Sequence, residues 1–520
     1  MKKIIISALT IFMLISASGC QDWLDVNHDP NVLEEIPDSK VLLPVAEVGL
    51  ANNLMGWDIG FAGGFWSEYW TQTYTASQFK FLCEYNETGF NTAYNSLTAG
   101  VLADLDKIKK LSLESQSKGN YYVAEALSIF TWQIITDLWG NVPYSEALKG
   151  SEGISSPKFD KGEDIYADLL KRVEELLKVD LSGAMVTSEY DFIYAGELEQ
   201  WKLFANSLKL KLMLRLSETP QYDNAKTLAF VKANRFLAKS AKIAGSVWVD
   251  GQEGKRHPMR EFEAGEANYL STNVIACKNF IDYLRNNNDP RISQLFTFSD
   301  PKAGTYRGAF FGDFDSKVAS DGSTTDNKVA YSKIKFAPDM DLMIMSDWEV
   351  SFYIAEVYAR AGDQAKAKEF YEKGVKASLQ QHGITETNIV EGDGYAVWKG
   401  GEQEEMIEQI GMQKWVANAH YQHVESFLER NRTKYPAIYD IDIKLKRQKA
   451  YSDPLLIGHL TISVNGRAKL NGGLPVSPLY PDAVMTRNEN KPDQKADLKE
   501  KVWWDKKAEI RIPEQTNGNN

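Results

Sequence analysis

The side chains best suited to contact a ligand are aromatic, and many of them gather in the stretch MGWDIGFAGGFWSEYWTQTYTASQFKF at residues 55–81. Sugar rings carry apolar C–H faces that flat aromatic rings can cover, while polar side chains bind the hydroxyls. We therefore expect ligand contacts from Trp57, Trp66, Trp70 and Tyr74. The same rings also suit a core, because Trp66 and Trp70 lie one helical turn apart and would share a buried stripe. The spacing leaves both interpretations open.

A second group of candidate contacts lies outside that stretch. Trp248, Arg256 and Tyr306 fall in a region rich in Gly, Asn and Asp, and Trp398 stands in the loop sequence GDGYAVWKGG. Arginine offers several N–H donors to ligand oxygens, and irregular loops on a rigid scaffold often carry binding residues. We expect these four side chains to contribute to ligand binding.

No pattern in the sequence predicts catalysis or a cofactor. The HExxH, GxSxG and phosphate-loop motifs do not occur in it. His420 and His423 lie one helical turn apart and could bind a metal, but a polar helix face explains them better. The aspartates from Asp313 to Asp326 lack the ligand spacing of an EF-hand. We expect no cofactor, no metal and no catalytic residue, although paired carboxylates meet only in space and the sequence leaves them open.

A helical scaffold is predicted to position these residues. Apolar residues recur at helical spacing, with charges between them, from Tyr94 to Leu216. Helical spacing returns in DWEVSFYIAEVYARAGDQAKAKEFYEKGVKAS, where small and aromatic residues fall at the positions of a tetratricopeptide repeat. Those residues are Ile354, Ala355, Tyr358, Gly362, Ala367 and Tyr371. Repeats of this kind need neighbouring helices to bury their faces, so we expect one helical array.

The predicted fold class is therefore mainly α: a tetratricopeptide-like helical repeat scaffold with long irregular insertions and few short strands. The helical core is expected over about 90–240 and 340–432. Gly, Asn, Asp and Ser accumulate over about 244–338, which we expect to be an irregular, ligand-facing insertion. The segment over about 434–520 is rich in Pro, Gly and Asn and is also expected to be irregular.

The chain begins with a leader that predicts its cellular address. Lys2 and Lys3 precede the apolar run Ile4–Ile15, which is typical of a secretory signal and too short for a membrane span. Small residues then lead to Cys20, an arrangement that resembles the bacterial lipobox. We expect residues 1–19 to be removed and Cys20 to carry acyl chains that anchor the protein to a membrane. An ordinary signal followed by a coincidental cysteine is the alternative.

The charge of the chain excludes some classes of partner. Without the leader and its two lysines, the formal net charge changes from −12 to −14. An acidic surface is repelled by nucleic acid and by anionic membrane, so neither is expected to bind it directly. A hydrophobic content of 43% suits a large globular core. Cys83 and Cys277, the cysteines that follow Cys20, would either pair or stay as buried thiols.

Several segments, in the same order along the chain, resemble the SusD/RagB family of nutrient-binding outer-membrane lipoproteins. They are DLWGNVPYSEAL (137–148), DFIYAGELEQWKLFANSLKLKLMLRLSE (191–218), SFYIAEVYARAGDQAKAKEFYEKGVKAS (351–378), IGMQKWVANAHYQHVESFLERNRTKYP (410–436), LPVSPLYPDAVMTRNEN (474–490) and KVWWD (501–505). The chain departs from the family's pattern at Asn141, Glu197, Lys211 and Phe427. The resemblance covers most of the chain, and it agrees with the helical repeat predicted from spacing.

The resemblance implies a single domain over residues 20–520 that binds ligand without catalysis. It implies an oligosaccharide or peptide ligand, and a TonB-dependent outer-membrane barrel as the partner to which that ligand is delivered. The protein would be held in the outer membrane through its N-terminal lipid, and Gln21 with Asp22 resembles an export signal for the outer face. Two other functions stay open: a surface glycan-degrading enzyme, and a repeat scaffold that binds only proteins.

Overall fold

The structure, a computed structural model, describes residues 39–73, 77–262, 269–314 and 330–514. The predicted lipid anchor Cys20 and the candidate contact Tyr74 lie outside these residues. None of the described helices combines the length and the hydrophobicity that a membrane span requires.

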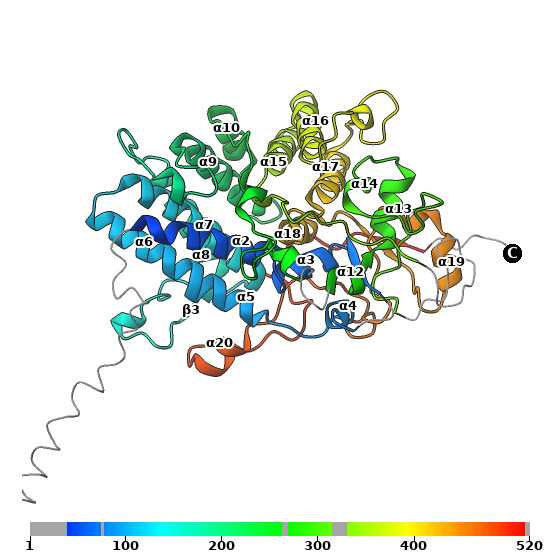
Figure 1. The fold of residues 1–520 in the computed structure, drawn as a ribbon, viewed down its shortest axis with the longest axis horizontal. Helices are drawn as coiled ribbons and strands as arrows, with labels where there is room; N and C mark the ends of the chain where they lie inside the picture. The colour runs from blue at the N-terminus through cyan, green and yellow to red at the C-terminus, as the bar shows by residue number, and fades with distance from the viewer. Residues whose placement is uncertain (1–38, 74–76, 263–268, 315–329, 515–520) are drawn as a thin grey trace, which may run out of the picture.

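Helices dominate the described chain, as the sequence predicts, and consecutive helices pack side by side (Figure 1). The longer helices are α2 (Leu43–Met55), α3 (Ile59–Trp66), α6 (Ala103–Glu114), α7 (Lys118–Trp139), α8 (Gly162–Leu176), α9 (Leu198–Arg215), α10 (Asn224–Ala233), α13 (Lys278–Asn286), α15 (Asp347–Arg360), α16 (Gln364–Gln381), α17 (Gln403–Asn418) and α18 (His423–Thr433). The shorter ones are α4 (Lys80–Cys83), α5 (Asn91–Asn95), η2 (Ser96–Leu102), α11 (Pro258–Glu261), α12 (Tyr269–Asn273), α14 (Ile292–Leu295), α19 (Arg447–Ser452) and α20 (Asp482–Arg487). The predicted mainly α fold class is confirmed.

Strands in the described residues are short, and each sheet pairs two of them. The antiparallel pairs are β1 (Trp70–Gln72) with β5 (Val274–Ala276), β2 (Val142–Pro143) with β3 (Phe159–Asp160), and β4 (Ala241–Ile243) with β6 (Leu342–Met345). The parallel pair is β7 (Ile438–Asp440) with β8 (Arg511–Pro513). The β1–β5 and β4–β6 pairs join segments that are distant in the sequence, so they fasten the irregular region to the helical scaffold.

The α15–α16 hairpin is the tetratricopeptide-like unit that the sequence predicts. α15 starts at a cap, because the Ser346 Oγ accepts the Glu349 N–H at 3.1 Å. The turn between the helices uses Gly362, whose φ of +75° suits glycine, and Asp363 then caps α16. Ala367 is fully buried where the two helices cross, and its small side chain permits their close approach.

The helical core begins well before residue 90, with α2 and α3. The sequence IGFAGGFW of α3 was difficult to assign to a helix because glycine disfavours helical structure. Here the glycines allow close packing. A Cβ on Gly63 would lie 2.5 Å from the His423 backbone carbonyl carbon, and one on Gly64 would lie 2.9 Å from the Trp70 ring. Contact with α18 and with Trp70 therefore outweighs the low helix propensity.

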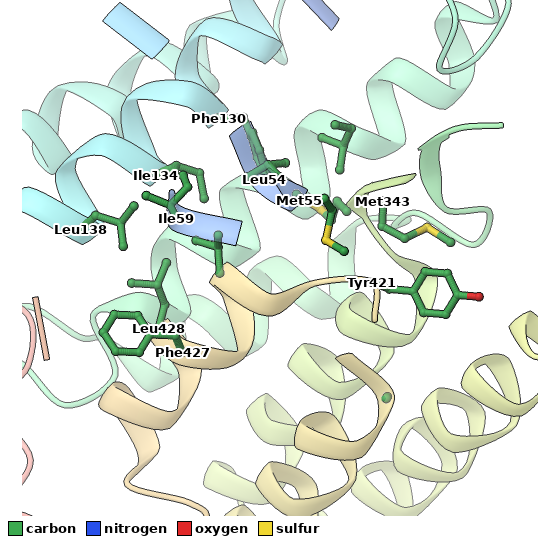
Figure 2. Packing of buried hydrophobic residues seen from close by; sticks show 14 of the residues in the cluster. Leu54, Met55, Ile59, Phe130, Ile134, Leu138, Met343, Tyr421, Phe427 and Leu428 are labelled. Carbon is green, nitrogen blue, oxygen red and sulfur yellow. The ribbon is translucent and has the colours of Figure 1, made fainter. Parts of the chain in front are cut away.

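An apolar core joins the first helices to α18 (Figure 2). Leu54 of α2 and Ile59 of α3 lie near Ile134 of α7, while Phe427 and Leu428 approach from α18. All five side chains are buried. The beginning of the described chain is therefore packed against a helix close to its end, which makes the scaffold one unit.

Another face of α18 carries buried charges instead of apolar groups. The Arg215 guanidinium of α9 contacts Asp137 at 2.9 Å, Glu425 at 2.9 Å and Glu429 at 2.6 Å. Arg432, also on α18, bonds Glu429 at 2.7 Å. Burial alone would raise the pKa of Glu429, but Arg432 and the other cations beside it hold that pKa well below its usual value. These ion pairs fix the relative positions of α7, α9 and α18.

Candidate ligand-binding site

A surface pocket with a volume of about 530 Å³ lies between α13, α17 and the loop that precedes α17. Its size falls within the usual range for small-ligand sites, ~300–1,000 Å³. The pocket, hereafter the tyrosine pocket, is lined by Tyr283, Tyr371, Tyr395, Val397, Lys399, Gly400, Gly401, Glu405, Glu408, Gln409, Met412 and Gln413. In Figure 1 the elements that contribute these residues lie together, although α13 is far from α17 in the sequence.

Tyrosines from three elements form its aromatic wall. Tyr283 and Tyr395 are half-buried, whereas Tyr371 is only 2% exposed and its hydroxyl donates to the Ala396 carbonyl at 2.9 Å. Tyr283 comes from α13, Tyr371 from α16 and Tyr395 from the loop, and all three line the pocket. The rings of Tyr283 and Tyr395 meet edge to face, with centroids 5.7 Å apart. Trp398 does not line the pocket but packs behind Tyr371 at 5.0 Å. Of the residues singled out from the sequence, Trp398 thus lies beside the wall and supports it.

A buried arginine holds the floor of the tyrosine pocket in place. Arg291 is fully buried and makes a close ion pair with Asp289, at 2.6 Å. It also donates to the Tyr395 hydroxyl at 3.3 Å and to the Gln413 Oε1 at 3.1 Å. Burial would raise the pKa of Asp289, but the Arg291 charge lowers it, so the pair is ionised. Arg291 therefore positions one wall residue and one floor residue without lining the pocket itself.

Four polar groups of the tyrosine pocket have no partner among the described residues. They are the Tyr283 hydroxyl, the Lys399 ammonium, the Glu408 carboxylate and the Gln413 amide nitrogen. Gln413 is only 2% exposed, and N–H groups buried without a hydrogen-bond partner are costly. A ligand in the pocket would supply that partner. Burial and then repulsion by neighbouring glutamates raise the pKa of Glu408. Donors, an acceptor and aromatic faces that converge in this way suit a ligand with hydroxyls and apolar ring faces.

The structure places two tryptophans of the predicted platform in the core instead of at a ligand site. Trp66 is 6% exposed, its Nε1 donates to the Leu82 carbonyl at 3.2 Å, and its ring packs on Phe427. Trp70 is fully buried and packs edge to face on His423 at 4.5 Å. Between the two interpretations of the stretch, these contacts favour the buried stripe, because contact with α18 leaves neither ring a face for a ligand.

Three of the other sequence-predicted contacts pack against one short segment, residues 257–262, which does not line the tyrosine pocket. Trp57 is half-buried and stacks on Phe262 at 4.9 Å. The half-buried Trp248 packs on His257, and Arg256 is bound by Glu261 at 2.8 Å. Tyr306 is half-buried and lies beside Phe298, 4.7 Å away. None of the four candidates among these residues (Trp57, Trp248, Arg256 and Tyr306) lines the tyrosine pocket.

Of the residues that could have bound a metal, His420, His423 and Asp313 are described, and their contacts are structural; Asp315, Asp321 and Asp326 lie outside the described residues. The His423 Nε2 accepts the His420 N–H at 3.0 Å, and both rings are buried. Asp313 pairs with Arg447 at 2.6 Å. Among the described residues no three histidine, cysteine or acidic side chains are grouped closely enough to hold a metal ion. Cys83 and Cys277 are both buried free thiols, so they do not form the disulfide that the sequence left open.

The tyrosine pocket thus lies on the surface of a helical repeat scaffold. The chain belongs to the SusD-like family, whose model, described as "Starch-binding associating with outer membrane", matches residues 30–451. The predicted family is confirmed. A comparison with curated proteins finds no match.

Solved structures share the fold of this chain. A SusD homolog from Bacteroides uniformis has 23% sequence identity and a TM-score of 0.70, over 90% of this chain and 99% of that one. A structure described as a chitin-binding protein has 21% identity and a TM-score of 0.68, over 90% and 100% of the two chains. A SusD homolog from Bacteroides thetaiotaomicron has 22% identity and a TM-score of 0.66, over 91% and 99%. At these identities the likeness establishes the fold.

Proposed function

We propose that this protein is a non-catalytic, lipid-anchored lipoprotein of the outer-membrane surface that captures an oligosaccharide in the tyrosine pocket. The captured ligand is then delivered to a TonB-dependent barrel in the same membrane. The observation that carries the ligand class is that the half-buried rings of Tyr283 and Tyr395 line one pocket with four unpartnered polar groups. A sugar satisfies both at once, because its ring faces are apolar and its edges are hydroxyls.

The carboxylates of the tyrosine pocket support binding without cleavage. Glycoside hydrolysis uses two carboxyl groups that flank the scissile bond, one of them on each side. Glu405 and Glu408 instead stand one turn apart on the same helix, α17, so they approach a ligand from one side. Glu405 is also occupied, because its Oε2 accepts the Glu402 N–H at 2.8 Å. The glycan-degrading alternative therefore has no suitable pair in this pocket.

The proposed location of the protein at the outer membrane rests on its leader sequence and on its family. Residues 1–19 and Cys20 have the pattern of a lipoprotein signal, and the family's description associates it with the outer membrane. An acidic protein needs such an anchor, because anionic membrane surfaces repel it. The barrel partner and the outward orientation follow from the resemblance to SusD/RagB lipoproteins.

The anchor is tested by removing its thiol. Cys20→Ala is expected to release the protein from the membrane fraction or to leave its signal uncleaved, because no acyl chain can be attached. Cys83→Ala, which removes a buried thiol, is the matched control and should fractionate like the wild type. Membrane fractionation with metabolic lipid labelling measures both. Lipid label retained by Cys20→Ala would contradict the anchor.

The ligand class is tested by binding to purified protein that starts after Cys20. Oligosaccharides derived from starch, chitin, cellulose, xylan and mannan would be titrated by calorimetry, and at least one is expected to bind without release of shorter sugars. Tyr283→Phe keeps the ring but removes the unpartnered hydroxyl. Loss of one hydrogen bond should weaken binding by about 2- to 10-fold.

Tyr306→Phe is the matched control for that substitution. It makes the same chemical change at a tyrosine outside the pocket, so affinity and melting temperature should both stay at the wild-type values. If Tyr283→Phe and Tyr306→Phe lost affinity for the oligosaccharide equally, the ligand would not be bound in the tyrosine pocket. Failure of every oligosaccharide to bind would contradict the proposed function.

A further inference from the structure

Some of the carboxylates at the tyrosine pocket have hydrogen-bond or ion-pair partners in the protein, and one does not. Three glutamates follow each other over the first two turns of α17. Glu404 is ion-paired with Lys507, and Glu405 is engaged by the Glu402 N–H. Glu408, one turn further on, is an exposed residue of the pocket lining. It makes no ion pair or hydrogen bond among the described residues, although the charges of Lys399 and Lys507 act to lower its pKa. Its carboxylate is thus the acceptor most available to an incoming group.

The single cation among the described lining residues does not cancel this charge. Lys399 stands on the loop, its side chain is exposed, and its ammonium makes no ion pair in the described structure. Against it stand the carboxylates of Glu405 and Glu408, so the lining carries an excess of one negative charge. The Asp289–Arg291 pair beneath the floor is neutral as a unit.

Aromatic faces and a free carboxylate together form a site for a cation. A cation over a tyrosine face is attracted to the ring's electron-rich face, within about 6 Å of its centroid. A carboxylate next to that face accepts charge-assisted hydrogen bonds from an ammonium group. The half-buried rings of Tyr283 and Tyr395 line the same pocket as Glu408, so one ligand can make both interactions. A neutral hydroxyl or acetamido group would gain neither the ion pair nor the cation–π contact.

We infer that the tyrosine pocket selects sugars that carry a free, protonated amino group, with the ammonium held between the Glu408 carboxylate and the tyrosine rings. This inference rests on the proposed function, and it narrows the ligand from oligosaccharides in general to amino sugars. The sugar rings cover the aromatic wall, and the Gln413 amide and Tyr283 hydroxyl take up ring hydroxyls.

The contribution of the amino group to affinity can be measured with three tetrasaccharides that share a β-1,4 backbone. They are chitosan tetraose with free amines, chitin tetraose with acetylated amines, and cellotetraose with hydroxyls. Binding would be measured by calorimetry at about pH 6, at which the sugar amines carry protons. Chitosan tetraose is expected to bind about tenfold more tightly than either neutral chain, with a preference that shrinks as salt is added.

Two substitutions on the same helix assign the preference to one carboxylate. Glu408→Gln keeps the shape of the side chain but removes its charge, and should reduce the preference for the amine to less than about twofold. Its affinity for the neutral tetrasaccharides should fall much less, because the glutamine amide oxygen still accepts a hydrogen bond from a sugar hydroxyl. Glu404→Gln removes a charge that lies outside the pocket lining and is paired with Lys507, so it should keep the full preference.

The outcomes separate this inference from the proposed function. Equal binding of the three tetrasaccharides, or binding of another oligosaccharide while all three fail, would overturn the amine inference and leave glycan capture in place. A preference that survives Glu408→Gln would also overturn it. Tighter binding of trilysine than of chitosan tetraose would show that the site takes basic peptides instead of sugars. Failure of every oligosaccharide would overturn the function itself.

Discussion

Replacement of Arg215 by methionine is expected to lower the free energy of unfolding by about 3–5 kcal/mol, because it leaves buried carboxylates without their cation. Arg215 is 1% exposed, and its guanidinium contacts Asp137, Glu425 and Glu429 at 2.6–2.9 Å. Methionine is long and adaptable, so the loss reflects the missing charge more than an empty cavity. Denaturant unfolding followed by tryptophan fluorescence measures the change.

The matched control for this variant is Arg511→Met. Arg511 pairs with Asp440 at 2.9 Å, but the two side chains are 37% and 30% exposed. Water and salt screen such a pair, so its loss should cost only ~0–1 kcal/mol. If Arg215→Met destabilised the protein no more than Arg511→Met, the buried ion pairs would not be what holds α9 to α18.

Trp70→Ala is expected to lower the free energy of unfolding by about 3–5 kcal/mol, because it empties a packed site that neighbours fill only partly. The Trp70 ring is fully buried against His423, Phe61 and Phe65. The measurement is the same denaturant titration, combined with calorimetric binding of the sugar that the wild type prefers. Affinity at a temperature where the variant is folded should be unchanged.

Trp57→Ala is the comparison from the same stretch of sequence. Its ring is half-buried on Phe262, so the loss of stability should be clearly smaller than for Trp70→Ala. Selective loss of affinity in either variant, at unchanged stability, would contradict the core assignment. It would place the ligand on the Trp-rich stretch instead of in the tyrosine pocket.

The helical scaffold could be predicted because its signal is local. The spacing of Ala355, Gly362 and Ala367 encodes the α15–α16 hairpin within one short segment, and the structure shows that hairpin. α3 could not be assigned in the same way. Its glycines disfavour a helix locally, and what compensates is contact with His423, which is remote in the sequence. Tertiary packing, not propensity, decides that element.

The tyrosine pocket could be predicted only in part. Trp398 was singled out because aromatic residues in glycine-rich loops are conspicuous, and it lies behind the pocket wall. Tyr283 and Gln413 carry no such local signal, since each has the appearance of an ordinary residue on its own helix. Their common feature is that they meet in space with free polar groups, which no spacing along the chain reveals. The same limit left Trp57 and Trp70 indistinguishable in sequence.

Hydrogen–deuterium exchange with and without saturating oligosaccharide tests the central claim most directly, because it locates the ligand without altering the protein. The ligand would be the tightest binder found by calorimetry. Ligand in the tyrosine pocket should slow exchange in the loop at residues 394–401, which contributes five residues to the pocket lining. The start of α17 and the end of α13 should also be protected. Protection confined to residues 57–72 and 248–262, with exchange at 394–401 unchanged, would contradict it.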